Sequence, residues 1–156
     1  MSPIDAQAGG TGVTNPASPI AAGNGTFMGQ NPPGVRAVTF SVQALPQGRV
    51  GGFAIFRDPG TNGFVHMNVT SMMFLGSSVA VAGPITMQAG SPFPVGATAF
   101  FVVQDNGDGT LVPDQLALGV APLFLGSLTI QEVIGLIGPP PPQAFTPLLT
   151  GNIRIF

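Results

Sequence analysis

Residues 95–118 read VGATAFFVVQDNGDGTLVPDQLAL, and this stretch predicts two strands joined by an acidic turn. Residues 97–103 are apolar or β-favouring at nearly every position, which is typical of a strand covered on both faces. Residues 105–110 contain Asn and Gly, which tolerate the positive φ angles of tight turns. We therefore expect a buried central strand that leads into a solvated turn.

The segments on both sides of this hairpin predict further strands. Residues 36–43 and 49–57, and the first half of residues 64–75, alternate between two faces, which indicates strands with one buried face. Residues 79–87 and 148–156 also read as strands, and Gly, Pro and Asn separate the segments. This pattern predicts an all-β fold: an antiparallel β-sandwich or barrel, jelly-roll-like, of about seven or eight strands.

Two places within these strands predict an irregular backbone. The adjacent Gly51 and Gly52 indicate either a β-bulge or the close approach of another backbone. Pro84 lies in the middle of residues 79–87. Because proline has no N–H to donate, it favours either an edge strand or a break at that point.

The stretch of residues 119–138 is ambiguous. Thr129 followed by Glu132 fits the start of a helix. A helix would bury a stripe made of Leu125, Leu128, Val133, Ile134 and Ile137. A short helix near residues 128–137 therefore stands beside two alternatives, irregular structure and a strand.

The first residues of the chain differ in composition from the rest. Residues 1–34 are rich in Gly, Pro, Ala, Ser, Thr and Asn, which predicts an extended N-terminal arm with at most one short strand. Residues 35–156 then form a single β-domain. The arm either lies on its own surface or docks on a neighbouring subunit by adding a strand to its sheet. The chain starts without a signal-peptide pattern, so we expect a mature form, unconventional export or no export.

The composition narrows the class of protein. Only 6% of the residues are charged and the formal net charge is −2, so charge repulsion gives little protection against association. This favours a subunit of an assembly. The four arginines are scattered, so we expect no nucleic-acid partner. The most apolar window, residues 116–130, is short and interrupted by Gly and Pro, so we expect no membrane span.

Several motifs, taken in their order, resemble a β-rich domain of secreted bacterial proteins that accompanies choice-of-anchor sorting modules. The matching segments are residues 38–42 (VTFSV), 52–58 (GFAIFRD), 65–71 (VHMNVTS), 100–109 and 149–155 (LTGNIRI). Phe56 replaces a tyrosine that is usual in the family, and residues 119–147 look like an insertion. The resemblance implies an extracellular or surface-exposed β-domain with no established catalytic role.

The sequence offers few residues for catalysis. His66 is the single histidine, and it lies on the polar face of a predicted strand. No Gly-x-Ser-x-Gly elbow is present, and the acidic residues gather in a turn rather than as a pair across a cleft. We therefore expect a protein that is not an enzyme.

The acidic turn is the candidate metal site. Asp105, Asn106, Asp108 and Asp114 offer the oxygen ligands that Ca²⁺ prefers. Their spacing lacks the later ligands of an EF-hand loop. The alternative is a hairpin turn whose Asp side chains cap backbone amides. We expect no other cofactor.

These observations favour a structural subunit that self-assembles into an extracellular filament, a surface layer or another shell, with its arm contacting the next copy. The expected location is extracellular or at the cell surface, and a virion or spore coat is a further possibility. The alternative function is a binding module whose barrel mouth accepts an apolar ligand or a glycan. The phenylalanines that could line such a mouth are Phe53, Phe100, Phe101 and Phe124, and the alternative is that they pack in the core.

Overall fold

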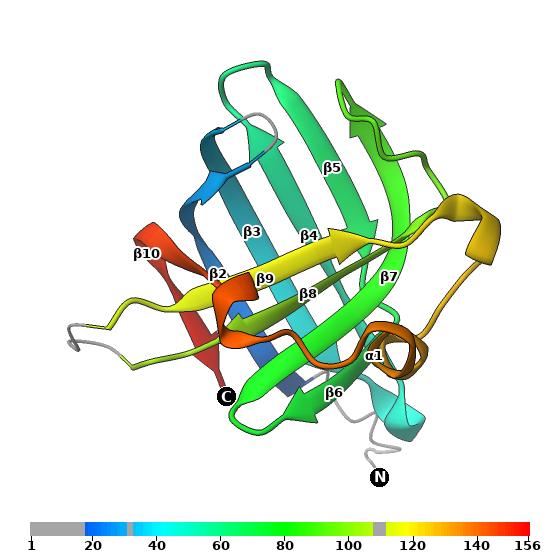
Figure 1. Cartoon of the computed structure of the whole chain (residues 1–156). Coiled ribbons are helices and arrows are strands. Elements are labelled where there is room, and N and C mark those ends of the chain that lie inside the picture. Colours follow the sequence, from blue (N-terminus) through cyan, green and yellow to red (C-terminus); the bar gives the residue numbers. More distant parts are fainter. Residues whose placement is uncertain (1–17, 31–32, 108–111) are drawn as a thin grey trace, which may run out of the picture.

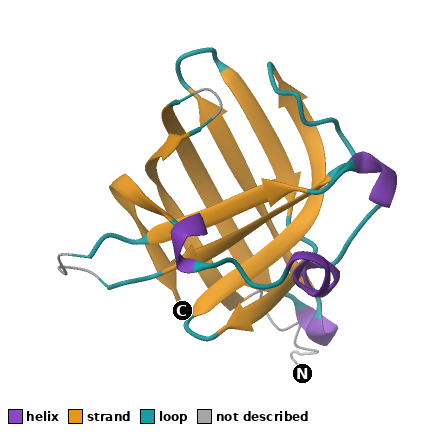
Figure 2. Ribbon diagram, viewed as in Figure 1, coloured by secondary structure: helices purple, strands orange, loops and turns teal. Residues whose placement is uncertain are grey.

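The computed structural model describes residues 18–30, 33–107 and 112–156, which form an antiparallel barrel closed by eight strands (Figure 1). The order around the barrel is β5-β4-β3-β2-β10-β9-β8-β7, and β7 returns to β5. One further strand, β6, pairs with β7, and a short helix lies outside the barrel (Figure 2). The strands are β2 (Ser18–Gly29), β3 (Gly34–Ala44), β4 (Val50–Asp58), β5 (Gly63–Asn68), β6 (Ser71–Leu75), β7 (Ser78–Ala89), β8 (Thr98–Gln104), β9 (Gln115–Val120) and β10 (Thr146–Ile155). The prediction of an all-β fold is confirmed, and of its two forms the structure is the barrel.

Apolar side chains from all eight barrel strands fill the interior. Phe101 of β8 lies at its centre and is 1% exposed. Its ring meets the edges of Phe40 and Phe56, with centroid distances of 5.3 and 5.7 Å. Edge-to-face pairs of this kind contribute about 1 kcal/mol each beyond the burial of their area. The core thus links β8 to β3 and β4 across the barrel.

Strand β8 is covered on both faces, as residues 97–103 predict. Phe101 faces the barrel interior, and Val102 faces the opposite way. There Val102 packs with Ile130 and Val133 of the helix α1 (Ile130–Ile137), which are 0% and 2% exposed. The outer cover therefore comes from a later segment of the same chain.

The helix α1 begins with a capping box. Glu132 N–H donates to Thr129 Oγ1 at 3.2 Å, and Thr129 N–H donates to Glu132 Oε1 at 2.9 Å. These two bonds satisfy amides at the first turn that have no partner inside the helix. The prediction of a short helix near residues 128–137 is confirmed, and the strand alternative is wrong.

Strand β7 changes partner along its length. Its first half pairs with β6 and its second half with β5, so the single strand expected for residues 64–75 is broken after Asn68. Gly83 lies at this changeover, where an added Cβ would collide with the carbonyl oxygen of Asn68. Pro84 follows, and β8 pairs along the other edge of β7. Strand β7 runs unbroken from Ser78 to Ala89, so the break expected at Pro84 is wrong, and so is the edge-strand alternative; the proline lies where the partner of β7 changes from β6 to β5.

Gly52 marks a close approach between two backbones, which was one of its two predicted roles. Its φ is +137°, and a Cβ there would fall on the carbonyl oxygen of Ser41 on β3. Its own carbonyl accepts a hydrogen bond from Val69 N–H at 2.9 Å. A side chain at this position would separate β4 from β3.

The predicted arm of residues 1–34 needs correction. Ser18–Gly29 form the strand β2, which pairs with β3 along its whole length and with β10 on its other edge. Glycine content contributed to the prediction of an arm, but in β2 the glycines provide space in the barrel wall. A Cβ at Gly23 would lie 2.9 Å from the ring of Phe40. The β-domain therefore includes β2 and does not begin at residue 35. Residues 1–17 of the predicted arm lie outside the described residues.

Candidate functional site

A cleft of about 490 Å³ opens at one end of the barrel. This end carries the β2–β3 and β4–β5 connections and lies at the top of Figure 1. Side chains from β2 to β5, from β9 and from the loop after β7 line it. Its volume falls within the range of roughly 300–1,000 Å³ that is typical of small-molecule sites, which often occupy barrel mouths.

The walls of this mouth cleft are mainly apolar. Phe27, Phe56 and Leu116 line it and also belong to the barrel core. Leu118 pairs with Phe101 in the β8–β9 ladder, so the two side chains are on the same, inner face of the sheet. Leu118 is nevertheless 47% exposed, whereas Phe101 is buried. The barrel interior is therefore left unfilled in front of Leu118.

One ion pair lies among these apolar groups. Arg36 continues the inward-facing series of β3, and Asp58 continues that of β4. Arg36 Nε lies 3.7 Å from Asp58 Oδ2, and the two side chains are only 18% and 25% exposed. Arg57 also lines the cleft. Among the described residues, the mouth thus combines the inward-facing pair of Arg36 and Asp58 with the exposed Arg57 of the outer face of β4, beside an apolar wall.

Two glycines make room for the Arg36 side chain. A Cβ at Gly29 would lie 2.6 Å from Arg36 Cγ, and a Cβ at Gly34 would lie 2.8 Å from Arg36 Nη1. Neither glycine has a positive φ, so the backbone conformation does not require glycine here. What requires glycine is the space that the arginine occupies.

The four phenylalanines predicted to line the mouth lie elsewhere, so that prediction is wrong. Phe53 lies on the outer face of β4, beside His66. Phe100 packs under α1, and Phe101 is in the core. Phe124 is 86% exposed in the 3₁₀ turn η2 (Leu123–Leu125). The phenylalanines that do line the cleft are Phe27, Phe56, Phe64 and Phe93.

The sequence contains a signal for part of this site. Arg36 shares its strand face with Val38 and Phe40, so the alternation of residues 36–43 places a cation on the inward face. A charged side chain at such a position is buried only when it is paired or functional. No comparable signal identifies Leu118, because it reads as an ordinary core position.

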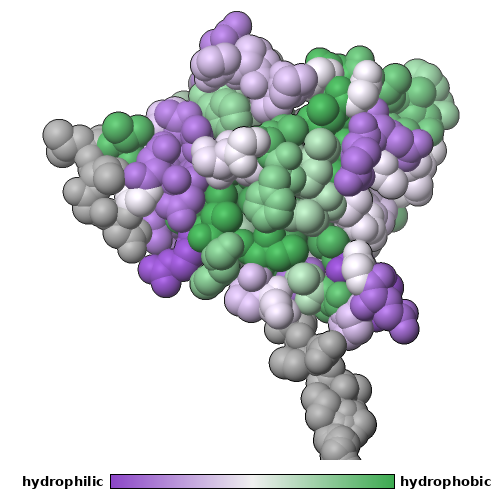
Figure 3. Space-filling view, turned by 90° about the horizontal axis from the view of Figure 1, so that it is seen from below, coloured by the Kyte–Doolittle hydropathy of each residue, from purple (hydrophilic) through white to green (hydrophobic). Residues whose placement is uncertain are grey.

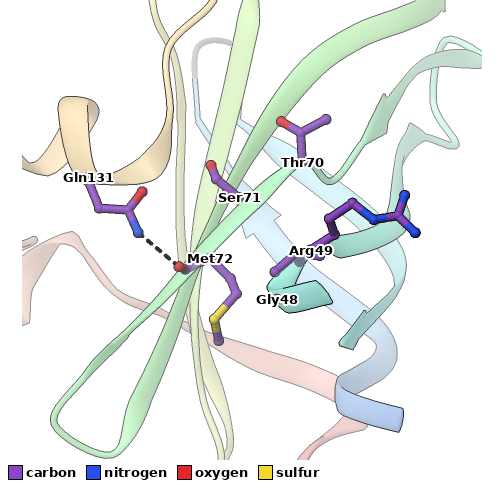
Figure 4. Close-up of a pocket in the computed structure, with 7 residues that line it drawn as sticks. Gly48, Arg49, Thr70, Ser71, Met72 and Gln131 are labelled. Atoms are coloured by element: carbon purple, nitrogen blue, oxygen red, sulfur yellow. Dashed lines mark hydrogen bonds between the residues drawn. The ribbon is translucent and has the colours of Figure 1, made fainter. Parts of the chain in front are cut away.

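A second, smaller hollow of about 350 Å³ lies between the 3₁₀ turn η1 (Pro46–Gly48), β6 and α1 (Figure 4). In this hollow Gln131 reaches from α1 and donates through Nε2 to the carbonyl oxygen of Met72 at 3.1 Å. Arg49 Nε donates to Pro46 O at 3.2 Å. Both polar side chains thus serve the local backbone, which favours a structural role for this hollow.

The acidic residues near the predicted turn bind backbone amides. Asp114 is buried, and its Oδ1 accepts from Asn106 N–H and its Oδ2 from Ile153 N–H, both at 2.7 Å. Asp105 accepts through Oδ1 from Gly107 N–H at 2.8 Å and through Oδ2 from Ile155 N–H at 3.0 Å. Strand β10 pairs with β9 at only two residues. The two carboxylates therefore hold the part of β10 that β9 does not reach.

This arrangement bears on the predicted calcium site. Asp105, Asn106 and Asp114 lie together, as expected, whereas Asp108 lies outside the described residues. Within residues 18–30, 33–107 and 112–156, no three His, Asp or Glu side chains gather as a metal site would require. Calcium binding by these four residues stays a prediction.

His66 has local partners on the outer face of β5. Its Nδ1 lies 2.8 Å from Thr86 Oγ1, and its ring stacks on Phe53 with a centroid distance of 6.2 Å. These are the cross-strand contacts of a surface histidine, and Thr86 Oγ1 also donates to the carbonyl of His66 at 3.3 Å. None of these contacts involves a carboxylate, so they give no support to a catalytic role.

The outer surface exposes several large apolar side chains. Figure 3 shows hydrophobic residues at the centre of the face seen from below, with hydrophilic residues on both sides. The large apolar side chains exposed on η2 and α1 are Leu123, Phe124, Leu125, Leu136 and Ile137. Of the helices in the described ranges, none has the length and apolar character needed to cross a membrane.

Comparisons with known proteins add no relative. No protein-family model matches this chain, and no curated protein or solved structure is significantly similar to it. The resemblance to the β-rich domain of secreted bacterial proteins therefore stays a prediction.

Proposed function

We propose that the protein is a binding module that holds a small, mainly apolar molecule in the mouth cleft of its barrel. The observation that carries this proposal is Leu118, an inward-facing side chain of the barrel wall that is 47% exposed. Protein interiors are normally packed without voids larger than a water molecule. An apolar position that faces inward and is still accessible favours a partner that completes the packing.

The size and lining of the cleft support the same function. Barrels of eight strands have an interior that side chains either fill or leave open for one small ligand. Here the core around Phe101 fills part of the interior, and the cleft of about 490 Å³ lies at the end that carries the β2–β3 and β4–β5 connections. The many apolar lining groups favour an apolar ligand over a glycan, which needs a larger number of polar partners.

The test is binding of a neutral apolar dye, Nile red, to the full chain. The chain has no Trp or Tyr, so the dye supplies the fluorescence signal. Leu118→Trp places a large ring in the cleft and is expected to weaken dye binding about tenfold or more, because the ring occupies the ligand volume. The matched control is Leu136→Trp on α1, a leucine that is 65% exposed and outside the cleft.

The outcome decides between the cleft and the outer surface. Loss of binding in Leu118→Trp with retention in Leu136→Trp supports the proposal. Equal binding by both variants, or loss only in Leu136→Trp, places the dye on the outer apolar surface and overturns it. Native mass spectrometry of the purified full chain then identifies any molecule that it retains.

A second candidate function is self-assembly as a structural subunit, and the exposure of Phe124 favours it. This side chain is 86% exposed, beside Leu123 and Leu125 at 49% and 43%. Large apolar patches of this kind commonly mark contacts with other proteins. The low charge of the chain offers little repulsion between copies. A location at the cell surface, in a filament, in a surface layer or in a coat belongs to this candidate.

Light scattering during size-exclusion chromatography tests this second candidate. Self-assembly predicts that the mass rises with protein concentration and that Phe124→Ser lowers it. Deletion of residues 1–17 tests whether the N-terminal segment takes part. A monomer at every concentration, unchanged by Phe124→Ser, contradicts self-assembly.

A further inference from the structure

We infer that the molecule held in the mouth cleft is an amphiphile with an anionic head group, and that the guanidinium of Arg36 binds this head group. The inference rests on the proposed function of the cleft and names the class of its ligand. Its basis is the position of a half-buried cation at the inner edge of an apolar wall.

The geometry directs Arg36 toward the ligand volume. Arg36 pairs with Phe27 in the β2–β3 ladder and lies on the same face as Val38. Its neighbour Phe27 lines the cleft and is 5% exposed. The arginine therefore stands where the apolar wall ends and the solvent begins. A bound amphiphile would place its tail along the wall and its head at this boundary.

The surrounding backbone is shaped for this side chain. Gly29 and Gly34 leave the space that the stem and the guanidinium of Arg36 occupy. Burial of most of an arginine side chain costs solvation free energy, and the stability of a barrel wall does not require an arginine at this position. An exposed polar residue would serve equally well at the end of a strand. The presence of an arginine in a space fitted to it favours a role in recognition.

The ion pair between Arg36 and Asp58 is a long one. The distance of 3.7 Å between Arg36 Nε and Asp58 Oδ2 exceeds that of a hydrogen bond. A ligand carboxylate can accept two parallel N–H bonds from a guanidinium, which is a stronger arrangement than an ion pair at this distance. Asp58 in turn helps to hold the arginine at the mouth.

The charge at the mouth is also complementary to an anion. Arg36 and Arg57 both line the cleft, and among its lining residues in the described part of the chain Asp58 is the single acidic one. The rest of the chain is nearly uncharged, with four arginines and six acidic residues among 156. Arg57 belongs to the outward-facing series of β4 and is exposed, so it adds positive charge at the rim of the cleft, beside the inward-facing pair of Arg36 and Asp58.

The experiment compares two ligands that differ only in the head group. Decanoic acid and decan-1-ol are titrated into the full chain below their solubility limits, at a pH that ionises the acid, with displacement of Nile red as the signal. The acid is expected to bind about tenfold more tightly than the alcohol, as a charge-assisted hydrogen bond predicts. Arg36→Met is expected to remove this preference, and Arg154→Met, a distant arginine on β10, to retain it.

Asp58→Asn separates recognition from a purely structural ion pair. If Arg36 binds the head group, removal of the competing carboxylate is expected to tighten binding of decanoic acid by about threefold. If the pair is only structural, the same change loosens the mouth and weakens both ligands.

The outcomes distinguish this inference from the proposed function. Equal affinity of the wild-type chain for acid and alcohol overturns the anionic head group and leaves the apolar cleft standing. Binding of neither ligand overturns both. A preference for the acid that survives Arg36→Met overturns the assignment to Arg36, and weaker acid binding by Asp58→Asn does the same.

Discussion

The buried carboxylate of Asp114 accepts a hydrogen bond from the backbone N–H of Ile153 at 2.7 Å, across 39 positions of sequence. This bond lies where the β9–β10 ladder has ended after two residue pairs. A side chain thus replaces the ladder on one side of the barrel. The acidic segment, whose composition suggests a metal site, therefore holds β10 in the barrel through the carboxylates of Asp105 and Asp114.

The first prediction concerns this closure. Asp114→Asn is expected to lower the free energy of unfolding by about 2 kcal/mol, because the amide NH₂ would face one of two backbone N–H groups and leave it unsatisfied. Asp105→Asn is the matched comparison, with an expected loss of about 1 kcal/mol at a more exposed position. Denaturant titration followed by far-ultraviolet circular dichroism measures both. A larger loss in Asp105→Asn would contradict the role given to Asp114.

The second prediction concerns calcium. All four carboxylate oxygens of Asp105 and Asp114 accept backbone N–H bonds, so a bound ion would have to compete with these amides. We therefore expect millimolar Ca²⁺ to leave the melting temperature unchanged, with Mg²⁺ as the control for ionic strength. A rise in melting temperature with Ca²⁺ that Asp108→Asn removes would instead support the calcium site.

The third prediction uses two adjacent glycines as a matched pair. Gly52→Ala is expected to cost about 3 kcal/mol or to prevent folding, because its φ is +137° and a Cβ would strike the backbone of Ser41. At Gly51 a Cβ would meet only Leu45 Cδ1, at 2.8 Å, and this flexible side chain can move. Gly51→Ala is therefore expected to cost less than about 1 kcal/mol. Equal losses in thermal melts of the two variants would refute the close-approach explanation.

The sequence predicts those parts of this fold in which one residue pattern has one physical cause. The run of apolar or β-favouring residues 97–103 favours cover on two faces, and the structure supplies it from the barrel core and from α1. Thr129 and Glu132 fix the start of α1 through bonds that depend only on neighbouring residues. A pattern that depends on neighbouring residues, or that indicates burial of a strand on both faces, can be interpreted without knowing which distant segments make the contacts.

The parts that the sequence does not predict depend on partners far along the chain. Gly23 and Gly25 suggest a flexible arm, but they are inward positions of β2 whose missing side chains leave room for Phe40 and Leu148. The cleft in front of Leu118 has the same character, because its lining residues come from segments far apart in the sequence. Neither feature follows from local propensity or alternation.

The last prediction concerns the fit of Arg36 in the mouth cleft. Gly29→Ala places a Cβ 2.6 Å from Arg36 Cγ, which belongs to the stem of the side chain, so the whole arginine must shift. Gly34→Ala places a Cβ 2.8 Å from Nη1, and this terminal atom can move by rotation of the guanidinium. If Arg36 binds an anionic head group, Gly29→Ala is expected to weaken binding of decanoic acid about fivefold and Gly34→Ala about twofold or less. Titration of decan-1-ol controls for damage to the apolar wall, and a fall in affinity shared by acid and alcohol would assign the effect to the wall rather than to the arginine.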